Sequence, residues 1–302
     1  RVTSADAYLP VGLTPPNLTI QGDAEVAEVL FDGSRARGVR LVDGSVIESA
    51  CVVLCAGVYG SPAILMRSGV GPSEHLRSLG IPVRVDLPGV GANLADHPSI
   101  AVDCGYRGTG RVGPLLHAPV TFHSAAAPTD EAPDLMFWLS DPEGDPPVFE
   151  IGILLLKPLS RGVVRLRSAD PREAPSITLP SLDDDSDVVR LGEGYRRALE
   201  VAHDPRVRAL CTAGPSPEPP DAGALLEMIR LQAISVPHVV GTCAMGPHPG
   251  EGAVVDAFGC VHGTEGLTVA DASIMPDEPS GFTQFPTIMI AERLSELVAS
   301  LL

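Results

Sequence analysis

The N-terminal part of the chain alternates between apolar and polar positions with a period of two, which is typical of β-strands with one buried face. Asp32-Gly33 and Asp43-Gly44 separate three of these runs. Asp-Gly between alternating runs is a strong hairpin signal, so the pattern predicts an antiparallel meander. We expect strands over residues 17–21, 25–31, 36–42 and 45–48.

The next segment changes from alternation to a continuous apolar run. Residues 51–55 read Cys-Val-Val-Leu-Cys, a pattern typical of a strand buried on both faces of a parallel sheet. The small residues Ala56 and Gly57 end this run, where a ligand can approach the backbone closely. Ser61-Pro62 then has the form of a helix start with a capping serine.

The middle of the chain is rich in proline and predicts further strands at 135–139, 149–156 and 162–167. Apolar residues at helical spacing predict one amphipathic helix over 187–202. The acidic run 183–185 precedes this helix, and we interpret it as a helix N-terminus stabilised by the helix dipole. A sheet covered by helices fits this part.

Composition limits the classes of partner. The net charge of −17 disfavours nucleic acid and anionic membrane surfaces, which bind basic faces. No apolar run reaches the length that spans a membrane. The six cysteines lack the spacing of a zinc site or a disulfide framework, which fits a reducing compartment, and we expect a cytoplasmic protein.

Four motifs, in order, resemble those of the glucose–methanol–choline (GMC) family of flavin-dependent oxidoreductases. Residues 57–71 resemble the second signature of the family, although Val58 stands where the family prefers a small residue. Residues 88–98 resemble the next loop of the family. The catalytic-histidine block is similar to residues 238–246, and the C-terminal flavin block to 266–276.

This resemblance implies an α/β protein with FAD as its cofactor. Residues 1–100 and 236–302 are expected to form a discontinuous Rossmann-like FAD-binding domain. Residues 101–235 are expected to form an α+β substrate-binding domain, with an antiparallel sheet above the flavin. The implied reaction is oxidation of an alcohol CH–OH to a carbonyl, with hydride transfer to the flavin N5.

The resemblance also assigns site residues. His238 matches the catalytic base, and an imidazole suits this role because its pKa lies near neutrality. Gln284 occupies the position of an Asn or a second His that binds the substrate oxygen. Contacts to the cofactor are expected from Val26, Ala56, Gly57, Asn93, His97, Asp271, Ala272, Thr283, Gln284 and Phe285, and no metal site is expected.

One family element has no counterpart here, since no strand runs into a G-x-G-x-x-G loop that would hold the FAD pyrophosphate. We therefore expect a separate N-terminal FAD-binding segment or subunit. Without it, FAD binding should be weak and an apolar edge should be exposed beside residues 51–57.

Three readings of the function remain open. The first is an active alcohol oxidase or dehydrogenase, and the second is a non-catalytic fragment or subunit of a split flavoprotein. The third is a family lyase without net redox chemistry. For the first, we expect a small to medium polar alcohol, because the middle segment is short and Trp138 is the single tryptophan. An oligomer is also compatible with the sequence.

Overall fold

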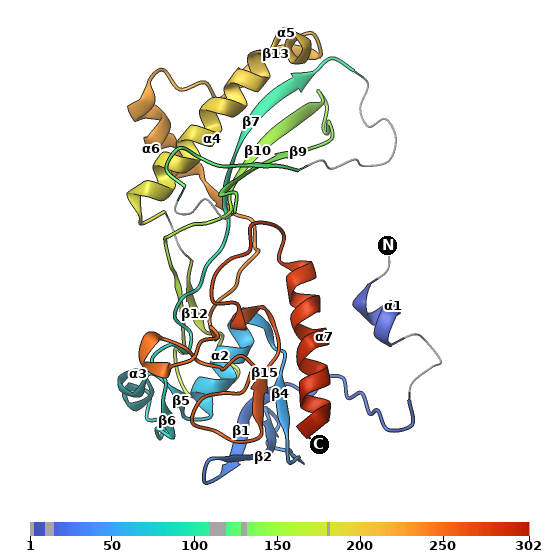
Figure 1. The fold of residues 1–302 in the computed structure, drawn as a ribbon, viewed down its shortest axis with the longest axis vertical. Coiled ribbons are helices and arrows are strands. Elements are labelled where there is room, and N and C mark those ends of the chain that lie inside the picture. Colours follow the sequence, from blue (N-terminus) through green and yellow to red (C-terminus); the bar gives the residue numbers. More distant parts are fainter. Residues whose placement is uncertain (1–2, 10–14, 109–118, 128–131, 180–181, 302) are drawn as a thin grey trace.

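The computed structural model describes residues 3–9, 15–108, 119–127, 132–179 and 182–301. Two bodies lie one above the other in Figure 1, each with its own apolar core. The core of the lower body draws on residues 29–95 and 240–294, so the two ends of the chain meet there. The core of the upper body draws on residues 100–229. The chain is a mixed α/β protein, as the sequence predicts.

The lower body begins with the expected meander. Its antiparallel strands are β1 (Val26–Asp32), β2 (Arg35–Leu41) and β3 (Val46–Glu48). Gly33 and Gly44 turn the chain between them with φ angles of 59° and 90°, which confirms both Asp-Gly hairpins. The strand predicted over 17–21 is wrong. Its residues are exposed and pair with no described strand, and a β-branched run without a surface to pack against gains little from an extended conformation.

The apolar run becomes β4 (Val52–Leu54), which pairs in parallel with β15 (Leu267–Val269). Among the described residues β15 is its one hydrogen-bonded neighbour. Val52 and Leu54 are buried, but Val53 is 40% exposed, so β4 is buried on one face only. The expectation of burial on both faces is thus wrong for the residues described.

The helix after β4 starts earlier than predicted. α2 spans Gly57–Arg67, and Pro62 lies inside it instead of at its first turn. Ser61 is not its capping residue. The Ser-Pro pattern predicts the wrong helix start because the φ angle of proline fits any helical position. Proline inside a helix is unfavourable because it lacks the N–H that would donate to the preceding turn. The Thr242 hydroxyl, from a later segment, compensates for that missing donor.

Shorter elements complete the lower body. They are β5 (Val70–Gly71), α3 (Ser73–Ser78), β6 (Val85–Asp86), β11 (Val163–Arg165), β12 (Ser176–Thr178), η1 (Pro249–Glu251) and η2 (Ala272–Ile274). The Val164 amide donates to the Gly91 carbonyl at 2.7 Å, and Leu166 joins the lower core. Part of the range 101–235 therefore packs in the lower body.

The upper body is built on an antiparallel sheet with the order β13-β7-β10-β9-β8, and β14 also pairs with β7. Its strands are β7 (Pro98–Tyr106), β8 (Val120–Phe122), β9 (Leu135–Leu139), β10 (Val148–Leu155), β13 (Cys211–Ser216) and β14 (Ile234–Ser235). The helices α4 (Asp185–His203) and α6 (Ala222–Gln232) cover one face of this sheet in Figure 1, and α5 (Pro205–Arg208) follows α4. Strands β9 and β10 and helix α4 agree with the sequence predictions.

The acidic run before α4 caps that helix as expected, because the Asp184 side chain accepts from the Ser186 amide at 2.8 Å. The last helix, α7 (Gln284–Leu301), begins two residues before Pro286. Gln284 and Phe285 thus form the first turn of α7. A short helix, α1 (Ser4–Tyr8), lies beside α7 in Figure 1, and the Tyr8 hydroxyl donates to Glu292.

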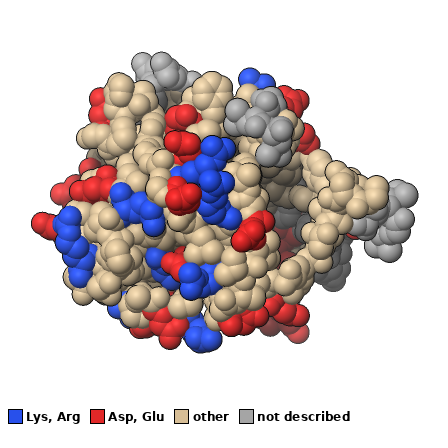
Figure 2. All heavy atoms as spheres, turned by 90° about the horizontal axis from the view of Figure 1, so that it is seen from below, with Lys and Arg blue, Asp and Glu red and all other residues tan. Residues whose placement is uncertain are grey.

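Charges on the lower face of the molecule are mixed. Figure 2 shows acidic and basic side chains interspersed there. Ion pairs such as Arg40 with Glu28 (3.0 Å) and Arg35 with Glu265 (3.7 Å) involve β1 and β2. This face offers no continuous basic surface. In the described part of the chain, none of the helices is long and apolar enough to cross a membrane.

Candidate active site

A cavity of about 880 Å³ opens where the sheet of the upper body meets the last turns of the lower body. Strands β7, β9 and β10 form one side of it, and the segments around His238 and Thr283 form the other. Side chains that are far apart in the sequence thus share one space. The residues that carry polar or aromatic side chains into it include Asp103, Trp138, Glu150, His238, Phe282, Thr283, Gln284 and Phe285.

His238 is held at the cavity wall through its backbone. Its amide donates to Asp96 Oδ1 at 2.9 Å, and the Ser235 hydroxyl donates to the other oxygen of the same carboxylate. Asp96 is buried and therefore fixes the start of the His238 segment. Burial lowers the pKa of His238, while the charge of Asp96 acts in the opposite direction. A lowered pKa favours the neutral imidazole, which is the form that can accept a proton.

Aromatic rings form a continuous wall beside His238. The Phe282 ring lies 5.1 Å from the His238 ring and 4.9 Å from Trp138, both in edge-to-face contact. The sequence suggests a segment poor in aromatic residues, yet folding brings Trp138 and Phe282 together at the candidate base. Such a wall gives the cavity an apolar surface next to a polar one.

Three residues assigned to substrate and flavin, which follow the last motif in the chain, also face the cavity. Thr283, Gln284 and Phe285 line it at the start of α7. Gln284 is exposed, and Phe285 is 78% exposed. The N-terminus of an 18-residue helix carries free amide groups and a partial positive charge, which suits an electron-rich ligand.

A second group of assigned residues meets at the ends of β4 and β15. The Asp271 carboxylate accepts from the Gly57 amide at 2.9 Å, the Ser61 hydroxyl at 2.6 Å and the Ser273 amide at 2.8 Å. The Gly241 amide donates to the Ala272 carbonyl at 3.4 Å, which connects this group to the histidine segment. The Asp271 carboxylate is thus engaged by its own chain, so its contribution to a ligand would be positional.

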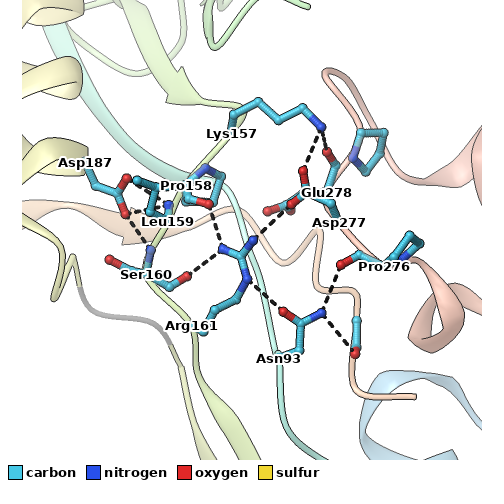
Figure 3. Close-up of polar contacts among 12 residues, drawn as sticks. Asn93, Lys157, Pro158, Leu159, Ser160, Arg161, Asp187, Pro276, Asp277 and Glu278 are labelled. Carbon is cyan, nitrogen blue, oxygen red and sulfur yellow. Dashed lines mark hydrogen bonds and ion pairs between the residues drawn. The ribbon is translucent and has the colours of Figure 1, made fainter. Parts of the chain in front are cut away.

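Asn93 lies at the centre of a polar network that joins three segments of the chain. Its amide oxygen accepts from Arg161 Nε at 2.9 Å, and its amide nitrogen donates to the Pro276 carbonyl at 3.1 Å. Figure 3 shows Arg161 between Asn93 and Asp277, with Lys157 on the far side of Asp277. This network fixes the turn 276–279 against residues 157–161.

Val26 lies apart from both groups. It begins β1 and pairs with Leu41, and it is not among the residues that line the cavity. Its predicted contact with the adenine remains a prediction.

His97 and Glu278 lie directly behind His238. Both side chains are fully buried, and His97 Nε2 is 3.5 Å from Glu278 Oε1. The sequence places His97 near the flavin, but it gives no sign of Glu278. A carboxylate in the run 276–279, between two prolines, looks like a solvated turn, and only the fold shows its burial.

Comparison with known proteins agrees with this geometry. The GMC oxidoreductase family models match residues 1–99 and 158–291, at the N-terminal and C-terminal parts of the family's sequence. The chain belongs to the GMC oxidoreductase family. Membership of this family supports an FAD-dependent oxidoreductase, with FAD as the cofactor.

Two relatives of known activity align with 99% of the chain. A 5-(hydroxymethyl)furfural oxidase from Methylovorus sp. (strain MP688) is 32% identical, and an oxygen-dependent choline dehydrogenase from Paraburkholderia phymatum is 34% identical. The chain covers 60% and 58% of their lengths, respectively. The chain therefore spans less than two thirds of the length of the curated relatives it matches.

Two solved structures are similar in fold to this chain. Pyridoxine 4-oxidase from Mesorbium loti has a TM-score of 0.89 and 27% identity over 98% of this chain and 61% of its own. A formate oxidase from Aspergillus oryzae, with a TM-score of 0.85 and 23% identity over 94% and 61%, shares the fold.

The residues present fit a flavin cofactor. Gly57 has a φ of 75°, and a Cβ built there would meet no atom within 4 Å, so the space beside the end of β4 is open. Ala56 before it is exposed. Open small residues at a strand end permit close approach of a large ligand. Among the described residues no cluster of metal-binding side chains occurs.

Proposed function

We propose that this chain supplies the substrate cavity and the base of an FAD-dependent enzyme that oxidises an alcohol CH–OH to a carbonyl. One observation carries the proposal, namely a half-buried His238 whose pKa is lowered and which lines a cavity at the start of α7. A neutral imidazole in this place is suited to remove a hydroxyl proton.

The chain's own residues would act in the following way. His238 accepts the proton of the substrate hydroxyl, which raises the electron density on that oxygen and weakens the carbon–hydrogen bond beside it. Gln284 donates from its amide to the same oxygen and orients it. When bound, FAD supplies the acceptor for the hydride that leaves the carbon.

The residues proposed to hold FAD belong to the two groups described above. Ala56, Gly57, Asp271 and Ala272 border the open end of β4, and Thr283, Gln284 and Phe285 form the approach to α7 and its first turn. Outside these two groups, Asn93 and His97 are also proposed to contact FAD, and Val26 is proposed to contact its adenine. The pyrophosphate would be held by an N-terminal Gly-rich segment or partner subunit.

The same proposal covers domain organisation and compartment. We propose that residues 1–100 and 236–302 form the FAD-binding part and 101–235 the substrate-binding part, with residues 157–178 packed against the former. A cytoplasmic location remains a prediction from cysteine usage. An oligomeric state also remains a prediction.

The cavity favours a small to medium polar alcohol. Among the described lining residues, Asp103 and Glu150 are carboxylates and none is Lys or Arg. Asp103 is exposed toward the cavity, and partial desolvation raises its pKa. A negatively charged alcohol would meet these carboxylates, whereas a neutral or cationic one would not be repelled. The relatives named above include enzymes for 5-(hydroxymethyl)furfural and for choline, which both satisfy this condition.

Anaerobic mixing of the purified flavoprotein with a panel of alcohols tests the function. Loss of the visible absorbance of the oxidised flavin supports the proposal. Conversion of the alcohol without bleaching would favour a lyase. If the isolated residues 1–302 neither retain flavin nor react, but a longer chain does both, the fragment or subunit reading holds for this piece.

A further inference from the structure

His238, which lines the cavity, contacts a second histidine that is fully buried. His97 Nδ1 lies 3.3 Å from His238 Nδ1, and the two rings meet edge to face with an interplanar angle of 84°. A contact of this length between two ring nitrogens requires one N–H and one lone pair. The protonation of His97 therefore decides which nitrogen of His238 carries hydrogen.

The other nitrogen of His97 settles its tautomer. His97 Nε2 is 3.2 Å from the Pro279 carbonyl oxygen, which can only accept a hydrogen bond. Burial, followed by the charge of His238, lowers the pKa of His97 to about 4, so its ring is neutral near pH 7 and carries a single hydrogen. That hydrogen belongs on Nε2, facing Pro279, and Nδ1 presents a lone pair to His238.

The neutral state of His97 depends on its buried neighbour Glu278. Neither carboxyl oxygen of Glu278 has a hydrogen-bond partner of acceptable geometry, although one lies 3.5 Å from His97 Nε2. An ionised carboxylate in this place would be unsolvated and would attract a proton onto His97. His97 would then become a cation with no lone pair for His238.

Charged groups face Glu278 from several segments. The acids Asp96 and Asp277 oppose its ionisation, and the cations Lys157 and Arg161 favour it. Lys157 donates to the Glu278 backbone carbonyl and to Asp277, and Arg161 donates to Asp277. Both cations therefore bind acceptors other than the Glu278 carboxylate, as Figure 3 shows. Burial, followed by Asp96, raises the pKa of Glu278 to about 9, so the group is a neutral acid at neutral pH.

We propose that His97 is a positioning residue that holds His238 in the Nδ1–H tautomer, and that Glu278, as a neutral acid, keeps His97 able to do so. His238 Nε2 then remains the nitrogen with the free lone pair, available for the hydroxyl proton. This last step rests on the proposed function, whereas the tautomer itself does not.

The tautomer is measured by two-bond ¹⁵N–¹H correlation spectra of the natural full-length chain labelled in histidine. His238 should appear as Nδ1–H in the wild type, and the His97→Leu variant should lose this preference. His97→Asn should retain it, because the amide oxygen of Asn can accept near the position of Nδ1. Observation of His238 as Nε2–H in the wild type would overturn the proposal, even if the Leu variant fails to fold.

The rate of flavin reduction by an alcohol provides a second readout. His97→Leu should lower the rate constant by about 10²-fold with little change in apparent substrate affinity. The wild-type rate should fall as Glu278 ionises near pH 9, and Glu278→Gln should remove this alkaline limb. Identical pH profiles would refute the role of Glu278.

A matched control separates the proposal from general effects of replacing a histidine. His262 Nε2 contacts the Gly246 carbonyl at 2.9 Å, outside the cavity, so His262→Asn should alter neither the His238 tautomer nor the pH profile. If no alcohol reduces the wild-type flavin, the proposed function fails, while the spectra still decide the tautomer.

Discussion

The Thr242 hydroxyl donates a hydrogen bond of 2.6 Å to the Val58 carbonyl, which lies four residues before Pro62 in α2. In a regular helix that carbonyl would accept from the amide of residue 62, which proline lacks. Thr242 is fully buried, so it replaces the missing donor from a segment far away in the sequence. The bond also joins the histidine segment to the helix that follows β4.

We expect Thr242→Val to lower the free energy of unfolding by about 1–3 kcal/mol, because it leaves a buried carbonyl without a donor while keeping the side-chain shape. Thr242→Ser retains the hydroxyl and should cost less. Denaturant unfolding of both variants checks this. Equal losses would mean that the methyl group, not the hydrogen bond, accounts for the effect.

Local patterns predict much of this fold. Asp-Gly hairpins, the strand at 135–139 and the amphipathic helix around 187–202 depend on neighbouring residues, and all are found. The carbonyl of Val58 in α2 is satisfied by Thr242, which lies 184 residues away in the sequence, and no local pattern contains that information. The extended run at 17–21 fails for a similar reason, since a strand requires a partner.

In the candidate site, too, some residues could be predicted from the sequence and others could not. Motif resemblance places His238 and Gln284, and the structure brings both to one cavity. Glu278 is missed because an acid between prolines has no apolar periodicity to mark its burial. The pairing of Trp138 with Phe282 is missed because it arises only when β9 and the turn before α7 meet.

Replacing the candidate base gives a direct kinetic prediction. His238→Ala should slow flavin reduction at least about 10²-fold, the usual size of a general-base contribution, with unchanged flavin content. Gln284→Ala should have a smaller effect, because an amide orients the substrate oxygen but takes no proton. Stopped-flow reduction under anaerobic conditions measures both. An unaltered rate in His238→Ala would show that another group is the base.

The carboxylates of the cavity should control the charge of acceptable substrates. Asp103 and Glu150 are paired across β7 and β10 and both line the cavity. The double variant Asp103→Asn with Glu150→Gln should raise kcat/KM for an anionic alcohol relative to a neutral alcohol of similar size. The change should shrink in high salt, because exposed charges are screened. A ratio that does not respond to the substitutions would exclude an electrostatic role for these residues.

The two buried groups behind His238 make opposite contributions to the dependence of stability on pH. The pKa of Glu278 rises from 4.5 to about 9 on folding, so between these values the folded state keeps a proton that the unfolded state has lost. Stability therefore falls as pH rises through this window. The pKa of His97 falls from 6.5 to about 4, so its contribution rises with pH between those two values.

Above pH 6.5 His97 is neutral in both the folded and the unfolded state. Of these two groups, only Glu278 then changes the dependence of stability on pH. Glu278→Gln should therefore gain stability over the wild type progressively from about pH 6.5 to 9, by at most about 1.4 kcal/mol per pH unit. Between pH 4.5 and 6.5 the wild-type contributions oppose each other, and the variant should lose stability more steeply on acidification because His97 acts alone. Thermal unfolding across this range measures the difference, with Glu265→Gln as a control at an exposed ion pair. Parallel curves for wild type and Glu278→Gln would mean that folding does not raise the pKa of Glu278, and that this group is ionised in the folded protein at neutral pH.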